Sequence, residues 1–300
     1  MKEQLQIAVI GDVHDRWSAA DNEALEALAV DLALFVGDFG NESVDIVRTI
    51  AELNVPKAAI LGNHDAWYTA SPWGRKRAPY NREAEDRVQQ QLDLLGTDHV
   101  GYGKLDFPEY NLSVVGGRPF SWGGSDWKNS DFYRDRFGVE SFEESAAKIA
   151  AVAQSTLCDN LIIVGHNGPL GLGEKPEDIC GKDWGELWGD HGDPDLRDAI
   201  AKIISYGKSI SFVTFGHMHH SLRHRGDRLR TTAKIGKDNV LYLNAASVPR
   251  VKTIEGVKAR NLTLVTMQDS SVTEANLVWL DSDCQTISQT ELYQKSSSSE

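Results

Sequence analysis

Five short apolar runs in this 300-residue sequence each end in a glycine followed by Asp, Asn or His. The clearest is KAAILGNHD at 57–65, where a buried-looking strand delivers three polar side chains at its tip. In open α/β sheets, ligands bind beyond the carboxyl ends of the strands. Glycine before the polar residue permits a sharp turn and a close backbone approach. We therefore expect the five tips to form one shared site. They are GDVH (11–14), GD (37–38), GNHD (62–65), GHN (165–167) and GHMH (216–219).

The residue types at these tips are those of a transition-metal centre. Carboxylates, imidazoles and an amide suit borderline divalent ions such as Mn, Fe or Zn better than Ca or Mg. Seven candidate ligands are too many for one tetrahedral ion, so the set predicts two ions that share a bridging carboxylate. The candidates are Asp12, His14, Asp38, Asn63, His166, His217 and His219.

The order of apolar runs predicts an α/β protein. Near-continuous apolar runs of four to six residues fit strands covered on both faces. We expect strands at 5–10, 31–36, 57–61, 111–115, 160–164, 210–215, 239–244, 261–267 and 274–280. Apolar residues at helical spacing predict helices at 20–30, 41–54, 81–96, 141–154 and 193–204, with Asn41 as an N-cap. The last third is mostly strands, which indicates an antiparallel end to the sheet.

The chain is expected to form one domain over residues 1–281. Insertions are expected at about 66–110 and at 168–195, because both contain long loops, one rich in aromatic and basic residues and the other in glycine. Loops of this length inside a domain tend to be lids or binding loops. The polar tail 282–300 is expected to be disordered.

Charge and cysteine content exclude several classes of protein. Lys and Arg total 31 against 44 Asp and Glu, so the net charge is −13 and no nucleic-acid groove is expected. The 3 cysteines lack metal-site spacing and indicate no disulfide framework. No run of 18 apolar residues is present, which predicts a cytoplasmic protein without a membrane span.

The five tips in this order resemble the calcineurin-like metallophosphoesterase family. The match runs from about residue 6 to 247 and includes NAASV at 244–248. The insertion GPLGLGEKPEDICGKDWG also resembles that of a cyanobacterial and plant-type subgroup. The resemblance implies a two-sheet β-sandwich flanked by helices, the metallo-dependent phosphatase fold, with a dinuclear metal centre.

The resemblance also implies how the ligands are shared. One metal would be held by Asp12, His14, Asp38 and His219, and the second by Asp38, Asn63, His166 and His217, with Asp38 as the bridge. A hydroxide between the ions would attack phosphorus. His64 falls on the family's catalytic histidine and would protonate the leaving oxygen.

The partner of His64 departs from several branches of the family. Those branches place an acid three residues after the Asp of GD, whereas this sequence has Asn41. An amide can orient an imidazole but cannot stabilise its cation by charge. Either Asn41 orients His64, or His64 pairs with Asp65 or another carboxylate.

Two residues are candidates for substrate contacts. Arg118 follows a strand between glycines and would suit a phosphate, with a loop-anchoring salt bridge as the alternative. His191 could reach the site from the second insertion, or could be a structural or exposed histidine. Loop tryptophans such as Trp67 and Trp122 could stack on a substrate ring or form small cores under the loops.

These features favour hydrolysis of a small phosphodiester or nucleotide. The alternatives are a phosphomonoesterase or a protein phosphatase, although GNHD and GDFGNE are less typical of the protein-phosphatase branch. A non-catalytic, protein-binding scaffold is a further alternative, against which the complete ligand set and His64 argue.

Overall fold

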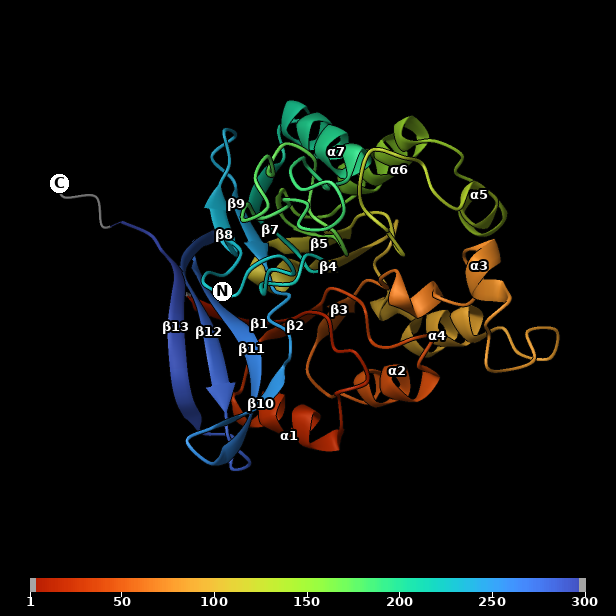
Figure 1. Ribbon diagram of the computed structural model, residues 1–300. Coiled ribbons are helices and arrows are strands. Elements are labelled where there is room, and N and C mark those ends of the chain that lie inside the picture. The colour runs from red at the N-terminus through yellow and green to blue at the C-terminus, as the bar shows by residue number, and fades with distance from the viewer. Residues whose placement is uncertain (1–3, 297–300) are drawn as a thin grey trace.

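The computed structural model describes residues 4–296 and contains two mixed β-sheets that pack face to face. The first sheet has the strand order β13-β12-β11-β1-β2-β3, with β10 paired to β11. Its strands β1, β2 and β3 run parallel, whereas β11, β12 and β13 are antiparallel (Figure 1). The strands are β1 (Gln4–Ile10), β2 (Leu32–Phe35), β3 (Lys57–Ala59), β10 (Val251–Ile254), β11 (Val257–Gln268), β12 (Ser271–Leu280) and β13 (Thr286–Gln294).

The second sheet has the order β4-β5-β6-β7-β9-β8. Its central strands β5, β6, β7 and β9 are parallel, and β4 and β8 close the two edges in antiparallel pairing. The strands are β4 (Lys104–Phe107), β5 (Leu112–Gly116), β6 (Asn160–Val164), β7 (Ser209–Phe215), β8 (Ala233–Ile235) and β9 (Leu241–Asn244).

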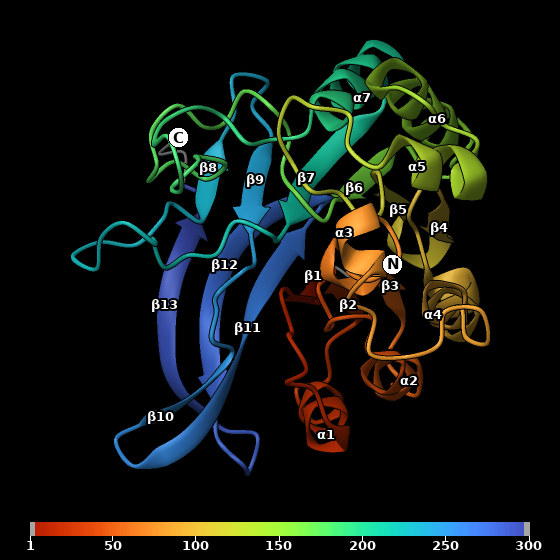
Figure 2. The same ribbon diagram turned by 45° about the vertical axis from the view of Figure 1, so that its right-hand side comes forward.

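Helices cover the outer faces of both sheets. Figure 2 shows α1 and α2 beside the first sheet and α6 and α7 beside the second. Their starts follow capping rules: the Ser141 hydroxyl accepts from Glu144 N–H at the start of α6, and Pro194 opens α7. The helices are α1 (Ala19–Ala27), α2 (Val44–Ala51), α3 (Pro72–Arg75), α4 (Arg87–Leu95), α5 (Ser130–Phe137), α6 (Phe142–Gln154) and α7 (Pro194–Ser205).

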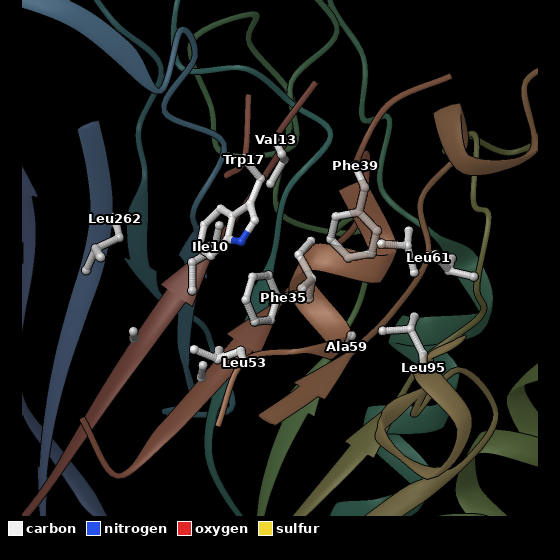
Figure 3. Packing of buried hydrophobic residues seen from close by; sticks show 14 of the residues in the cluster. Ile10, Val13, Trp17, Phe35, Phe39, Leu53, Ala59, Leu61, Leu95 and Leu262 are labelled. Carbon is white, nitrogen blue, oxygen red and sulfur yellow. The ribbon is translucent and has the colours of Figure 1, made fainter. Parts of the chain in front are cut away.

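Alternate residues of the central strands enter different cores. Ile7 and Val9 of β1 lie between the sheets, whereas Ala8 and Ile10 face the helical layer. Figure 3 shows Ile10 and Phe35 packed in that outer cluster with Trp17 and Phe39. Burial on both faces explains why these strands read as continuous apolar runs. The fold class expected from the sequence is confirmed.

The C-terminal tail corrects one prediction. Residues Thr286–Gln294 form β13, which pairs antiparallel with β12, although disorder was expected over 282–300. The strand was missed because most of its side chains are exposed and polar, so it lacks an apolar run. Residues 297–300 lie outside the described part of the chain. Within 4–296, no helix combines the length and apolarity needed to cross a bilayer.

Candidate metal centre

All predicted ligands follow the carboxyl ends of strands that lie side by side. Asp12 and His14 follow β1, Asp38 follows β2, and Asn63 follows β3 in the first sheet. His166 follows β6, and His217 and His219 follow β7, in the second sheet. The centre therefore lies where the strand ends of the two sheets meet.

The backbone at four of these positions is left-handed. Asp12, His14, Asp38 and His217 have φ of 49°, 46°, 57° and 65°. This conformation costs roughly 1 kcal/mol or more per non-glycine residue. The orientation of these side chains therefore lowers the stability of the fold. The preceding Gly37 has φ +95°, and a Cβ there would lie 2.5 Å from Gly62 N. Position 37 therefore requires glycine, as expected from the sequence, because any larger side chain would collide with the backbone of Gly62.

The first group of ligands contains Asp12, His14 and His219. The Nε2 atoms of the two histidines lie 3.1 Å apart, and His219 Nε2 lies 3.3 Å from Asp12 Oδ1. That Oδ1 atom is buried and accepts no hydrogen bond from the described residues. An unsatisfied carboxylate oxygen facing two imidazole nitrogens is the arrangement that a divalent cation would complete.

The second group contains Asp38, Asn63, His166 and His217. Asn63 Oδ1 lies 2.9 Å from both His166 Nε2 and His217 Nδ1, and His166 Nε2 lies 3.3 Å from Asp38 Oδ1. His166 is oriented by its other nitrogen, Nδ1, at 2.8 Å from Val36 O. A backbone partner on the second ring nitrogen is typical of a metal-binding histidine.

Asp38 lies between the two groups. Potential ligand atoms of Asp38, His166 and His217 lie within 4.8 Å of one another, as do those of His14, Asp38 and His64. The residues present therefore fit two divalent ions near a shared carboxylate.

The protonation states suit metal binding. Burial, followed by repulsion from His166, lowers the pKa of His217 well below its ordinary value, which keeps this imidazole neutral. Burial acts to raise the pKa of Asp12, but His219 outweighs it and holds this pKa below the usual range. The site thus combines a neutral imidazole with an ionised carboxylate.

His64 lies beside both groups. Its Nδ1 is 2.6 Å from Asn41 Oδ1, and its Nε2 is 3.9 Å from Asp38 Oδ2. Because an amide oxygen only accepts, Nδ1 carries the hydrogen and Nε2 is the nitrogen that can exchange a proton with a ligand. Burial lowers the pKa of His64. Asn41 is therefore the partner of His64, and α2 takes Ser43 as its N-cap instead.

Asp65 does not pair with His64, which corrects the second alternative for this histidine. Its buried carboxylate accepts hydrogen bonds from the backbone N–H groups of Gly62 (2.7 Å), Phe39 (2.9 Å) and Asp38 (3.0 Å). Asp65 therefore ties together the loops after β2 and β3 and positions the ligands that they carry.

Arg118 is likewise not available to a phosphate, so its prediction as a substrate contact is wrong. Its side chain is 4% exposed, with Nε 2.8 Å from Asp195 and Nη2 3.0 Å from Asp193. Nη1 also donates to the Tyr133 hydroxyl at 3.3 Å. These contacts make it the loop-anchoring salt bridge that was the alternative.

His191 does lie next to the centre. Its ring is stacked with that of His217 at 6.0 Å between centroids, and its Nε2 lies 3.1 Å from Trp122 O. Burial, then nearby Lys128, lowers the pKa of His191 to about 4, so it is neutral near pH 7. Its contact with a substrate stays a prediction.

An aromatic stack beside His64 was not assigned from the sequence. The Trp67 ring is parallel to that of His64 at 4.5 Å, and Trp122 stacks on Trp67 at 5.2 Å. Both tryptophans fall in loops, which was the available signal, but spacing alone could not show which would meet His64. Asp193 and Asp195, the partners of Arg118, were also not identified beforehand.

Comparisons with known proteins identify the family of the chain. A model of the calcineurin-like phosphoesterase family matches residues 5–221. No curated protein matches the chain. Among solved structures, a dimetal phosphatase from Danio rerio has a TM-score of 0.51 at 11% identity, covering 97% of this chain and 99% of its own.

Two further solved structures are less similar. A Thermus thermophilus protein has a TM-score of 0.47 at 10% identity, covering 96% of this chain and 99% of its own. A purple acid phosphatase from yellow lupin seeds has a TM-score of 0.44 at 12% identity, covering 97% of this chain and 54% of its own.

Proposed function

Because the chain belongs to the calcineurin-like phosphoesterase family, we propose that it hydrolyses a small phosphodiester or nucleotide with two divalent metal ions. Hydrolysis of phosphoric ester bonds is the activity of the family, whereas the substrate class and the roles of individual residues are our proposal. The observation that carries it is the unsatisfied Asp12 Oδ1 facing the imidazoles of His14 and His219.

The residues of the site have two proposed roles, as metal ligands and as a proton donor. Asp12, His14, Asp38 and His219 would hold one ion, and Asp38, Asn63, His166 and His217 the other. The bound ions, Mn, Fe or Zn by donor type, would polarise the ester and lower the pKa of water. Two carboxylates against two divalent ions leave a positive site that attracts an anionic ester despite the chain's net charge of −13.

His64 would serve as the general acid. Asn41 holds the hydrogen on Nδ1, and Trp67 covers one ring face, so Nε2 points to the centre in one orientation. To act as the acid, His64 would have to be in its imidazolium form, with hydrogens on both ring nitrogens. Its Nε2 would then give a proton to the leaving oxygen of the ester and leave the neutral ring with its hydrogen on Nδ1. A positioned acid of this kind contributes about 10² to 10⁴-fold to the rate.

The test compares p-nitrophenyl phosphate, bis-p-nitrophenyl phosphate and phenyl phosphate, with Mn²⁺ added, for wild type and His64→Ala. We expect diester turnover, and a loss in the variant that is larger for the poor leaving group phenol than for p-nitrophenol. The matched control is His224→Ala, an exposed histidine after the GHMH segment, which should retain the rate.

Other outcomes identify the alternatives. Turnover of monoesters alone would overturn the diester preference and favour a phosphatase. Equal activity of wild type and His64→Ala would remove His64 as the acid. Stoichiometric metal binding without any turnover would favour the protein-binding scaffold. The cytoplasmic location and the plant-type subgroup stay predictions.

A further inference from the structure

A polar cavity of about 510 Å³ lies between α3, α4 and α5, and none of the predicted metal ligands lines it. Figures 1 and 2 both show these three helices beside one another. Three arginines line it: Arg75 at the end of α3, Arg82 before α4 and Arg136 in α5. The lining acids are Asp86 and Asp135.

Two of the arginines form no ion pair with a carboxylate among residues 4–296. Arg75 is fixed by backbone oxygens, with Nε 3.0 Å from Thr69 O and Nη2 3.3 Å from Ala70 O. Arg82 has a buried Nε atom with no hydrogen-bond partner. A buried guanidinium N–H without a hydrogen-bond partner costs free energy.

The acids at the cavity are already engaged. Asp86 accepts from Arg136 Nη2 at 2.5 Å and caps α4 by accepting from Gln89 N–H at 3.0 Å. Burial acts to raise the pKa of Asp86, but the hydrogen bonds from Gln89 and Arg136 and the positive charges of Arg136 and Arg82 outweigh it and lower this pKa. Asp135 pairs with Arg134 at 3.1 Å. Asp86 is thus shared between Arg136 and Arg82, and Arg75 has no carboxylate partner, so the three arginines of the lining outweigh its two acids.

We infer that this cavity binds a tetrahedral oxyanion, a phosphate or phosphoryl group, with Arg75 and Arg82 as its principal ligands. A guanidinium presents forked N–H donors that match the oxygen spacing of phosphate. Arg75 is held in place before binding, so little side-chain entropy is lost when the anion enters. The inference does not depend on the chemistry proposed for the metal centre.

The test is calorimetric titration of the full-length, Mn²⁺-loaded chain with inorganic phosphate. Phosphate can also bind at the metals, so the readout is the binding component that disappears in Arg82→Gln and in Arg75→Gln. We expect at least about tenfold weaker binding for that component in each variant. The matched control is Arg48→Gln on α2, an exposed arginine outside the cavity, which should leave every component unchanged.

Phosphate binding that is the same in wild type, Arg75→Gln and Arg82→Gln would overturn the inference. If Arg82→Gln fails to fold, Arg82→Lys replaces it, since an ammonium keeps the charge but lacks the forked donors of a guanidinium.

Kinetic measurements then separate the two sources of the anion. A higher KM for a nucleoside diphosphate, but not for p-nitrophenyl phosphate, in Arg82→Gln assigns the site to a second phosphoryl group of the substrate. Unchanged KM values with a lost phosphate component assign it to free phosphate.

Discussion

The amide oxygen of Asn41 lies 2.6 Å from Nδ1 of His64. The contact fixes the tautomer and the ring orientation without adding negative charge. Asn41→Ala should therefore lower kcat by about tenfold, which is less than removal of the acid itself. Asn41→Asp should restore orientation and retain most of the rate. Equal kcat values for wild type and Asn41→Ala, measured with phenyl phosphate, would contradict the positioning role.

Metal binding should stabilise the fold strongly. A hundredfold excess of Mn²⁺ over its dissociation constant adds about 2.7 kcal/mol to the free energy of unfolding. Urea unfolding of wild type with Mn²⁺ or with EDTA measures this gain. Asp38→Asn, which weakens both ligand groups, should lose most of it. A gain of the same size in that variant would show that Mn²⁺ binds elsewhere.

Removal of Arg118 should affect stability and leave substrate affinity unchanged. Arg118→Ala leaves Asp193 and Asp195 buried without their cation, which costs about 3–5 kcal/mol. Urea unfolding checks the loss, and Arg134→Ala, an exposed arginine of α5, serves as the control with an expected change within about 0.5 kcal/mol. A raised KM for p-nitrophenyl phosphate without lost stability would instead indicate that Arg118 contacts the substrate.

His99 should make the fold sensitive to mild acid. Burial lowers the pKa of His99 to about 4, from an ordinary value of 6.5, and its buried Nε2 has no partner among the described residues. The unfolded chain therefore takes up the proton first as pH falls. Stability is fully present above pH 6.5 and is lost between pH 6.5 and 4, by up to about 3 kcal/mol.

His99→Phe cannot take up this proton and should be less sensitive to pH in that window. The measurement is the difference in unfolding free energy between wild type and variant at several pH values, which cancels the other titrating groups. A difference that stays constant from pH 7 to pH 4 would show that His99 does not cause the loss.

The sequence predicted the parallel strands and the clustering of the candidate metal ligands at their ends because one constraint produces both. A strand buried on both faces is a short apolar run, and its carboxyl end must turn at once toward the site. β13 is not buried on both faces: Leu292 and Tyr293 pack on the core, while most of the strand is exposed. Its pattern is that of a polar tail.

Partner choice within the site was less predictable. Asp65 closes the GNHD tip and Arg118 follows two glycines, and these motif-like positions made both residues functional candidates. Their roles depend on residues brought close by folding: Asp65 meets backbone N–H groups 26 and 27 positions away, and Arg118 meets acids 75 and 77 positions away. Spacing along the chain carries no record of such contacts.

The left-handed backbone at four positions implies a trade-off between activity and stability in this protein. The four residues are Asp12, His14, Asp38 and His217. Glycine at any of these positions would relax the main chain while deleting a proposed metal ligand. A library of variants screened only for heat resistance, with metal withheld, should accumulate glycine there. The same library screened for turnover should reject it. In a set of related proteins with this fold, glycine at these positions would then identify the members in which selection for activity has been lost.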